Sequence, residues 1–378
     1  MEISKLLLEW YDRSARSLPW RGTRDPYRIW LSEIMLQQTR AEAVVRYYDR
    51  FLSRFPDVAS LAAAGEDEVL KLWEGLGYYS RARNLHAAAR RVAADGGRFP
   101  QSVEGLEALP GIGPYAARAI ASIAYGLAVP ALDGNQMRVL SRCFAVERVL
   151  KTPFDLEAEA LSCLSADRPG DYNQALMDLG AGICTPKRPK CLICPLAPAC
   201  RACAEGEPER YPLRPAPVPK REEARTVLLI EAPGGMCIRR RDGERLLGGL
   251  YEFPSVQGWL TPEQVHAWLP EAGFGAATEI SPLPPAKHVF THMIWRMQGW
   301  HLRVQCAPAE LLQADAEALR GHAFPSALKL YREIALEMLE DFRPAPQDSA
   351  LKAQAECAKM EERQFLPEAN DAHGFKEG

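Results

Sequence analysis

Four cysteines fall close together in the middle of this 378-residue chain and have the clearest capacity for metal chemistry. Their spacing is Cys184-x6-Cys191-x2-Cys194-x5-Cys200. Four thiolates from one compact loop can hold an iron–sulfur cube, and we expect a 4Fe-4S cluster here. Zinc is the alternative, but four-thiolate zinc sites more often pair two C-x2-C knuckles and this loop has one. A fifth cysteine, Cys203, follows, and we expect it to be a free thiol beside the site.

Basic side chains lie between and just after these cysteines. They are Lys187, Arg188, Lys190 and Arg201. A loop of this kind can offer its cations to phosphate groups. The same cations could instead balance the negative charge of a thiolate-bound cluster, and the two interpretations are compatible.

A glycine-rich hairpin is the second pattern with chemical capacity, at Leu109-Pro110-Gly111-Ile112-Gly113. Glycine permits tight turning and close backbone approach. Because Gly113 precedes a new helical pattern, free backbone amides there could bind a phosphate. A simple turn between two helices is the alternative. A carboxylate, Asp133, follows downstream in Leu132-Asp133-Gly134-Asn135, before the cysteine loop.

The elements that must position these residues are predicted to be mainly helical up to residue 203. Apolar residues recur at helical spacing from the first turns onward. Short Gly and Pro segments separate the helical stretches. We expect helices near 28–38, 40–55, 66–75, 80–95, 115–125, 136–146, 155–165 and 171–182.

The composition changes after residue 203, which predicts a second domain. We expect a helical domain over 1–203 with the cysteine loop at 184–200, a Pro-rich linker over 204–225, an α+β domain over 226–342 and a disordered tail over 343–378. In the α+β domain we expect strands at 226–230 and 236–239 joined at Gly234-Gly235, later strands around 287–293 and 298–305, and helices near 261–270 and 325–341.

Charge and composition restrict the possible partners. The first 225 residues are mildly basic and the remainder is acidic, which fits a polyanionic partner for the first part. No segment approaches the length of an apolar membrane span, and the N-terminus lacks the regions of a secretory signal. We therefore expect a cytoplasmic protein, in which ten cysteines would not form disulfides.

The order of these features along the chain resembles the helix-hairpin-helix superfamily of endonuclease III and MutY. The order is a helix, the hairpin, a second helix, the aspartate and the four-cysteine loop. Within this superfamily, Trp30-Leu31-Ser32-Glu33-Ile34-Met35-Leu36-Gln37-Gln38-Thr39 resembles the MutY adenine glycosylase signature. Further matches are Leu18-Pro19-Trp20-Arg21 and Gly75-Leu76-Gly77-Tyr78-Tyr79-Ser80-Arg81. The resemblance covers nearly all of 1–203 and extends more loosely to about 335.

The residue at the position of Tyr115 distinguishes the members of this superfamily. Bifunctional endonuclease III-like members carry a lysine there, whose amine forms a Schiff base with the sugar. A phenol cannot do this, and the guanidinium of Arg118 stays protonated and is no substitute. The resemblance therefore implies a monofunctional glycosylase.

The resemblance also implies how the reaction proceeds. Glu33 would be the general acid that protonates adenine N7, if burial raises its pKa. Asp133 would stabilise the oxocarbenium-like sugar, with Asn135 and Tyr115 completing the catalytic set. A surface glutamate and a helix N-cap are the alternatives for the two carboxylates, and capping is compatible with catalysis.

An enzyme that acts on a base within duplex DNA must first extrude it. By resemblance, Tyr78 would intercalate as a wedge and Gln38 would contact the vacated space. A buried core tyrosine is the alternative for Tyr78. The flipped adenine would lie in a pocket of Arg16, Trp20, Arg21 and Gln174, and the backbone of Gly111 and Gly113 would bind a DNA phosphate.

The second domain resembles the MutT-like, Nudix-related C-terminal domain of MutY, with Leu246–Pro254 as its loop segment. The acidic cluster that a Nudix enzyme needs to hold metal is missing from the 261–270 helix, so recognition is the remaining role. In the family a Phe-Ser-His loop reads 8-oxoguanine, and the matching residues are Phe290, Thr291 and His292. Thr291 adds a methyl group that could change the discrimination between 8-oxoguanine and guanine. A core-facing strand residue is the alternative for Phe290.

The sequence thus predicts a monomeric base-excision-repair enzyme. It would hydrolyse the N-glycosidic bond of adenine opposite 8-oxoguanine or guanine in double-stranded DNA. A bifunctional pyrimidine glycosylase-lyase of endonuclease III type is the main alternative, and a non-catalytic DNA-binding module is a second.

Overall fold

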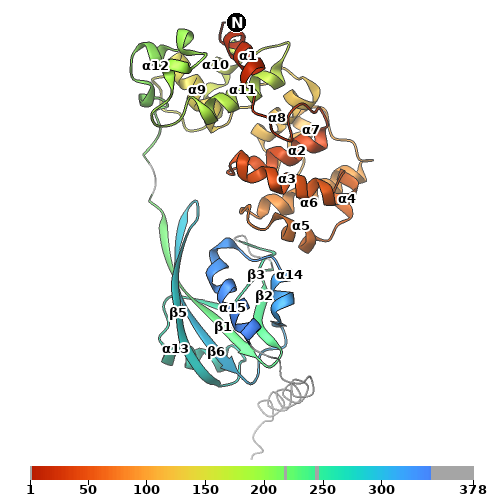
Figure 1. The fold of residues 1–378 in the computed structure, drawn as a ribbon, viewed down its shortest axis with the longest axis vertical. Coiled ribbons are helices and arrows are strands. Elements are labelled where there is room, and N and C mark those ends of the chain that lie inside the picture. Colours follow the sequence, from red (N-terminus) through yellow and green to blue (C-terminus); the bar gives the residue numbers. More distant parts are fainter. Residues whose placement is uncertain (1, 217–218, 243–246, 342–378) are drawn as a thin grey trace, which may run out of the picture. The chain divides into compact units, whose positions relative to one another are not determined.

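The computed structural model describes residues 2–216, 219–242 and 247–341 (Figure 1). The chain divides into two compact units, Met1–Val218 and Pro219–Gly378. Residues 217–218 of the expected linker and the expected tail over 343–378 lie outside the described residues. In the described ranges, no helix is both long enough and apolar enough to cross a membrane.

Unit 1 is helical, as the periodicity predicts. Its helices are α1 (Glu2–Ser14), α2 (Pro26–Leu36), α3 (Ala41–Arg54), α4 (Val58–Ala63), α5 (Glu66–Trp73), α6 (Ser80–Ala94), α7 (Val103–Glu107), α8 (Pro114–Tyr125), α9 (Gly134–Phe144), α10 (Glu157–Cys163), α11 (Pro169–Gly182) and α12 (Arg201–Ala204). Short 3₁₀ turns lie at Pro153–Leu156, Cys191–Ile193, Ala197–Ala199 and Pro208–Arg210.

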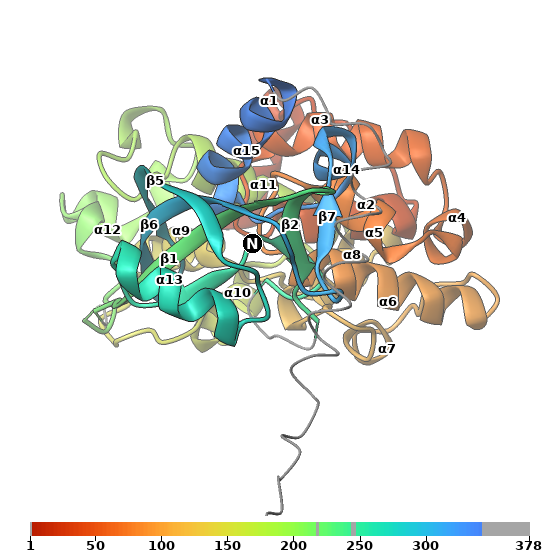
Figure 2. The same cartoon turned by 90° about the horizontal axis from the view of Figure 1, so that it is seen from below.

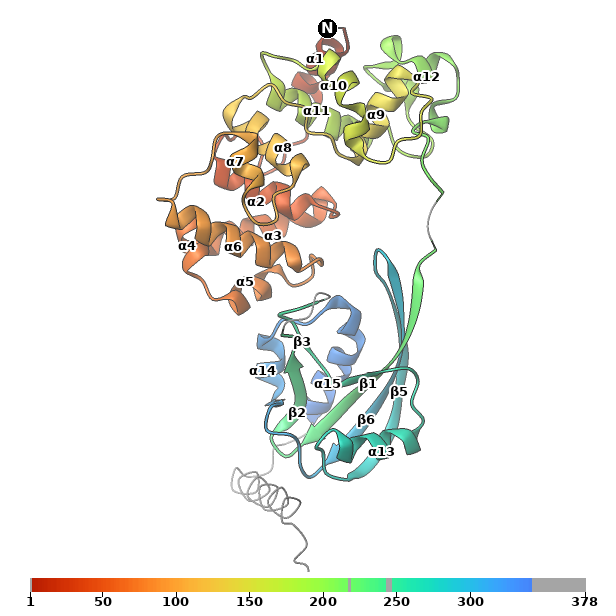
Figure 3. The same ribbon diagram turned by 180° about the vertical axis from the view of Figure 1, so that it is seen from behind.

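These helices form two groups, which Figures 1 and 3 show from opposite sides. One group holds α2 to α8. The other holds α1 and α9 to α12, and its core joins Leu7 of α1, Leu140 of α9 and Leu176 of α11. Cys184, Cys194 and Cys200 pack against this second core. The two groups meet where α8 packs against α11.

The N-terminal ends of three helices fix the positions of the predicted site residues. Asp25 caps α2 through its carboxylate and Pro26 opens the first turn, which fixes the helix that carries Glu33. Gly113 is the N-cap of α8 and has no side chain to cap it, so its first amides stay open. Asp133 caps α9 by accepting from the backbone amides of Asn135 and Gln136.

Unit 2 is built on a mixed sheet of order β3-β2-β1-β6-β5, with β4 pairing β1 and β7 pairing β2. Its strands and helices are β1 (Arg221–Ala232), β2 (Gly235–Arg240), β3 (Tyr251–Glu252), β4 (Ser255–Gln257), α13 (Pro262–Glu271), β5 (Ala277–Val289), β6 (Met293–Val304), β7 (Leu312–Ala314), α14 (Ala316–Gly321) and α15 (Lys329–Asp341).

The central strand β1 is buried on both faces. Val227 and Leu229 pack with Tyr331 of α15, whereas Leu228 and Ile230 pack with Val265 of α13. Because successive side chains of a strand point to opposite faces, the sheet lies between α13 and α15 (Figure 2).

Two expectations for unit 2 need correction. The strand expected around 287–293 is interrupted, because β5 ends at Val289 and β6 begins at Met293. Residues 290–292 form the turn of this hairpin, closed by the Phe290 amide donating to the Met293 carbonyl at 2.8 Å. In addition, β1 begins at Arg221, inside the range expected for the linker.

Candidate active site

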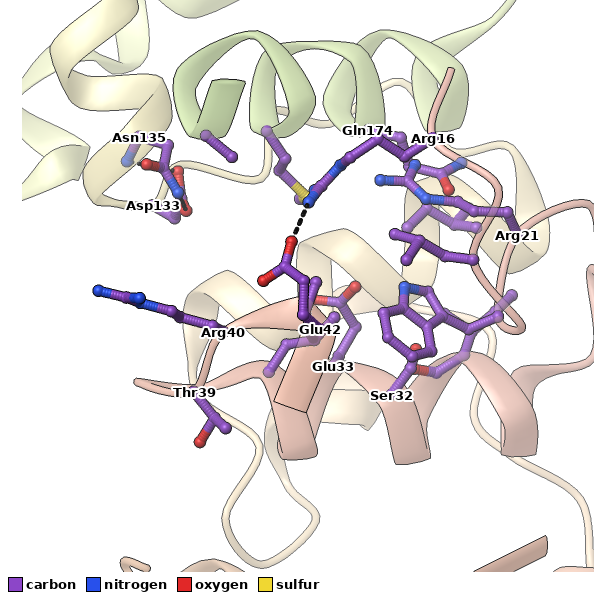
Figure 4. A pocket seen from close by; sticks show the side chains of 18 of the residues that line it. Arg16, Arg21, Ser32, Glu33, Thr39, Arg40, Glu42, Asp133, Asn135 and Gln174 are labelled. Atoms are coloured by element: carbon purple, nitrogen blue, oxygen red, sulfur yellow. Dashed lines mark hydrogen bonds and ion pairs between the residues drawn. The ribbon is translucent and has the colours of Figure 1, made fainter. Parts of the chain in front are cut away.

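A cavity of about 780 Å³ in unit 1 collects the predicted catalytic residues and the predicted base-pocket residues (Figure 4). Its walls come from α2, the segments before and after α2, the start of α3, and α8, together with the start of α9 and α11. The predicted residues that line it are Arg16, Trp20, Arg21, Glu33, Gln38, Tyr115, Asp133, Asn135 and Gln174. Tyr78, Gly111 and Gly113 are not part of this lining.

Glu33 is the buried carboxyl of the cavity. Its side chain is on α2, and the residue is only 4% exposed. Burial raises the pKa of Glu33 to about 7, against the opposing effects of the Tyr115 hydrogen bond and the Arg21 charge. The Tyr115 hydroxyl donates to Glu33 Oε2 at 2.9 Å. A carboxyl with this pKa is protonated in a large fraction of molecules near neutral pH, as a general acid must be.

Asp133 is the second carboxyl that lines the cavity, across from Glu33 on α9 (Figure 4). It accepts from the amides of Asn135 and Gln136 at 2.8 and 2.7 Å, and from Asn135 Nδ2 at 2.9 Å. Burial raises the pKa of Asp133, while these hydrogen bonds lower it. The residue is therefore an N-cap and a cavity-facing carboxyl at once, so capping does not compete with a catalytic role.

Hydrogen bonds lead from Asp133 to the cysteine loop. Asn135 Oδ1 accepts from Arg138 Nη2 at 2.9 Å. Arg138 in turn donates through Nε to the Cys184 carbonyl at 2.8 Å and through Nη2 to the Gly180 carbonyl at 2.8 Å. The first cysteine of the loop is thus tied through two side chains to the carboxyl that lines the cavity.

One residue beside the cavity was missed by the sequence analysis. Asp178 of α11 accepts from Arg16 Nε at 2.9 Å and Nη2 at 2.7 Å, and from Arg21 Nη2 at 3.0 Å. Its side chain is 2% exposed. Arg21 also donates to the Tyr11 hydroxyl at 2.8 Å. One buried carboxylate therefore orients both arginines of the predicted base pocket.

The signal that could have found Asp178 is its place in the sequence. It is the one carboxylate in the apolar run from Ala175 to Gly182, on a helix that must be buried. A buried carboxylate requires a cationic partner, but the sequence does not reveal which one.

Tyr78 and Gln38, the two residues expected to enter DNA, have left-handed backbone conformations, with φ of 48° and 57°. Tyr78 is 46% exposed, which is unlike a core tyrosine. In the hairpin, Gly111 has a φ of 76°, and a β-carbon there would lie 2.5 Å from Asn84 Cβ. Glycine is therefore required at this position of the hairpin.

The cysteine loop brings its four expected ligands into one neighbourhood. Burial, together with the nearby thiols of Cys184, Cys200 and Cys191, raises the pKa of Cys194 to about 12. Arg142 is almost fully buried and donates to Cys184 Sγ at 3.2 Å. It also donates to the carbonyls of Thr185 at 2.8 Å, Pro186 at 3.0 Å and Tyr211 at 3.1 Å.

Across the ranges that the structure describes, no three His, Cys, Asp or Glu side chains are grouped to hold one metal ion. An iron–sulfur cube is larger than a single ion and is held by one thiolate at each corner. The donor set is four cysteine thiols, which both an iron–sulfur cube and zinc accept. Cys203 interacts with Cys191, so it lies beside the set.

In unit 2 the predicted recognition residues form the turn between β5 and β6. The Phe290 ring packs edge-on against Trp295 at 4.9 Å and against His288 at 4.6 Å between ring centroids. Lys220 Nζ donates to the Phe290 carbonyl at 2.8 Å, and the Arg221 amide to the His292 carbonyl at 3.2 Å. The turn is thus anchored on β5, on β6 and at the start of β1, while its tip carries Thr291.

Comparison with known proteins defines the class first. Residues 31–164 match the family model described as HhH-GPD superfamily base excision DNA repair protein, and residues 226–333 match the NUDIX domain model. A solved thermostable thymine-DNA glycosylase is 31% identical, with a TM-score of 0.51 over 54% of this chain and 95% of that chain. The chain is thus a helix-hairpin-helix DNA glycosylase with a MutT-like α+β second domain.

Two curated relatives define the family. The adenine DNA glycosylase of Mus musculus is 34% identical over an alignment of 412 positions, which covers 92% of this chain and 80% of the mouse protein. That of Buchnera aphidicola subsp. Acyrthosiphon pisum is 33% identical over 298 residues, which span 77% of this chain and 84% of that protein. The chain belongs to the adenine DNA glycosylase family of base excision repair.

Proposed function

We propose that this protein releases adenine from positions opposite 8-oxoguanine or guanine in duplex DNA and leaves the DNA strand intact. The observation that carries the proposal is the buried Glu33, with a pKa of about 7, facing the same cavity as Asp133. Paired carboxyls with different environments are the arrangement that glycosidic bond cleavage uses.

The reaction proceeds from the protonated form of Glu33. Its proton moves to adenine N7 while the bond from N9 to C1′ breaks, so that adenine leaves as a neutral base. The sugar becomes an oxocarbenium-like cation, which the Asp133 carboxylate stabilises. A water oxygen then bonds to C1′, and its proton returns to Glu33. The Tyr115 hydroxyl holds the Glu33 carboxyl in place through its 2.9 Å hydrogen bond.

A lyase step requires an amine that can form a Schiff base with the sugar. The described lining of the cavity includes no lysine. The Tyr115 phenol, whose pKa is raised well above 10 by burial, occupies the corresponding position. This supports a monofunctional reaction rather than the endonuclease III type.

The decisive experiment compares duplexes containing A opposite 8-oxoguanine, A opposite G, or an oxidised pyrimidine, each with and without alkali. Adenine release that needs alkali for strand scission is the expected result. Efficient borohydride trapping on DNA would overturn the monofunctional assignment. Glu33→Gln should abolish base release and retain DNA binding, and full activity in that variant would overturn the choice of acid.

The turn Phe290–His292 is the proposed reader of 8-oxoguanine. Its anchoring by Lys220 and by the aromatic contacts of Phe290 supports a defined loop conformation. Thr291→Ser tests the effect of the extra methyl group. We expect a changed ratio of activity on 8-oxoguanine to activity on guanine, and an unchanged ratio would show that the methyl group does not matter.

The proposed cofactor is a 4Fe-4S cluster held by Cys184, Cys191, Cys194 and Cys200. When bound, it would organise the loop that carries Lys187, Arg188 and Lys190 and would take no part in breaking the glycosidic bond. Purified protein should contain about four irons and about four acid-labile sulfides per chain. One zinc per chain without labile sulfide would overturn this assignment.

We also propose that the enzyme acts as a monomer in the cytoplasm, where the bacterial nucleoid would be its substrate. Size-exclusion chromatography with light scattering tests the monomer. Fluorescence microscopy of a tagged chain tests the location.

A further inference from the structure

Arg81, in the first turn of α6, makes an unusual number of contacts for one buried guanidinium. It is 8% exposed. Its Nη1 donates to three carbonyls at the end of α2, those of Ile34 at 2.8 Å, Met35 at 2.9 Å and Gln37 at 2.6 Å. These contacts cross 44 to 47 residues of sequence and join α6 to α2.

The other nitrogen of the same group holds a different segment. Nη2 donates to the carbonyls of Leu76 at 3.1 Å and Gly77 at 3.2 Å, and to Thr39 Oγ1 at 3.3 Å. The guanidinium also lies 5.2 Å from the Trp73 ring and 5.7 Å from the Tyr78 ring. A single planar group therefore connects the end of α2 with the loop that leads into α6.

Electrostatics explains why the cation is stable there. The last carbonyls of a helix lack partners and carry a partial negative charge. Helix α2 has no basic residue in its own last turn, so Arg81 supplies that charge from another helix. Burial lowers the pKa of Arg81 to about 10, which leaves it protonated at neutral pH.

Each of the two segments that Arg81 joins contains a non-glycine residue with a left-handed backbone conformation. Gln38, with φ 57°, directly follows the Gln37 carbonyl, and Tyr78, with φ 48°, directly follows the Gly77 carbonyl. For residues other than glycine, this conformation persists only where the surroundings impose it. Each strained residue thus has a neighbouring carbonyl fixed by the same guanidinium.

We propose that Arg81 is a positioning residue for base extrusion, which holds Gln38 and Tyr78 together in the conformations that enter DNA. This rests on the proposed function, in which Tyr78 is the wedge and Gln38 contacts the vacated space. Arg81 itself does not touch the base. Its effect should therefore scale with the cost of extrusion, and not with the chemical step.

The test uses two substrates with the full-length protein. In one, adenine lies opposite 8-oxoguanine in a duplex that also carries 2-aminopurine beside the adenine. In the other, adenine lies in an unpaired loop, where extrusion costs little. Arg81→Lys keeps the charge but loses the planar fork, and Arg90→Lys, at an exposed position of the same helix, is the matched control.

We expect Arg81→Lys to lower single-turnover base release about tenfold on the duplex and less than about threefold on the unpaired substrate, as for loss of one or two hydrogen bonds. The 2-aminopurine fluorescence rise on binding should fall in parallel, and Arg90→Lys should match the wild type. Equal losses on both substrates, or no loss on either, would overturn the proposal.

Two further variants distinguish the proposed role of Arg81 from the proposed role of Tyr78 as the wedge. Tyr78→Ala should show the same preference for the unpaired substrate, and the double variant with Arg81→Lys should lose less than the product of the two effects. If Tyr78→Ala loses equal activity on both substrates, the assignment of Tyr78 as the wedge fails. If Tyr78→Ala prefers the unpaired substrate but Arg81→Lys does not, only the proposed role of Arg81 is refuted. Should Arg81→Lys not fold, Thr39→Val removes one acceptor and should give a smaller loss confined to the duplex.

Discussion

Replacement of Glu33 by Gln should make the protein more stable at alkaline pH while it abolishes catalysis. The side chain keeps its size and its ability to accept from Tyr115, but it can no longer carry a charge in a buried site. Burial raises the pKa of Glu33 from 4.5 to about 7. The unfolded chain therefore releases this proton more readily than the folded chain, and folding of the wild type becomes less favourable as pH rises.

The size of the effect follows from the pKa difference. Each unit corresponds to about 1.4 kcal/mol, so a shift of roughly 2.5 units gives a penalty of about 3 kcal/mol above pH 8. At pH 5 Glu33 is almost fully protonated in the folded state, and the penalty is below about 1 kcal/mol. The gain from Glu33→Gln should therefore appear mainly between pH 5 and pH 8.

Urea unfolding of unit 1, followed by helical circular dichroism at pH 5 and pH 8.5, measures this difference. Glu9→Gln, at an exposed position of α1 outside the cavity lining, is the control, and its effect should be small at both pH values. A Glu33→Gln variant that gains nothing at pH 8.5, or gains equally at both pH values, would refute the claim that burial raises the pKa of Glu33.

Three further predictions concern residues around Glu33 and the cysteine loop. Tyr115→Phe removes a hydrogen-bond donor that favours the charged form of the Glu33 carboxyl. The alkaline limb of the pH–rate profile should therefore move up by about one pH unit. A limb that moves to lower pH would contradict this. Asp178→Asn should move the same limb down, because Arg21 then faces Glu33 without its anionic partner, and should also lower the unfolding free energy by on the order of 2 kcal/mol in chemical denaturation. Arg142→Gln should lower the iron content per chain measured after purification, because it removes the donor to Cys184 Sγ and loosens the loop; unchanged iron and sulfide would show that the loop holds without it.

The helical unit was predictable where its helices are long and periodic. For example, α3 and α6 span 14 and 15 residues, long enough for the apolar pattern to repeat. The short helices α4 and α7 have six and five residues and give no repeat, so no helix was predicted there. In both, an N-cap side chain, Asp57 or Ser102, marks the start.

The β5–β6 hairpin was misplaced for a different reason. Pro282, Pro284 and Pro285 argue against a strand because proline removes ladder donors, yet all three lie in β5. The strand is at the edge of the sheet, where one side needs no partners. The sequence does not indicate which strand will be at an edge, so a proline-containing strand could not be predicted here.

The residues of the candidate site likewise include some that the sequence predicts and some that it does not. Residues in recognisable motifs, such as Glu33, Asp133 and Tyr115, could be predicted to share one site, and they line one cavity. Asp178 and Arg81 were not, because their importance depends on partners more than 40 residues away. The pairing of a buried charge is a property of the tertiary fold and leaves only the weak signal of a polar residue in an apolar surrounding.

Helix α2 connects the proposed general acid to the residues proposed to extrude the base. It carries Glu33 and ends at the carbonyls that Arg81 binds, directly before Gln38. The raised pKa of Glu33 depends first on the exclusion of water around α2. Different contacts place the two parts: burial in the body of α2 sets the environment of Glu33, whereas Arg81 of α6 holds the end of the helix before Gln38. This separation is why a change at Arg81 should affect extrusion and leave the chemical step largely intact.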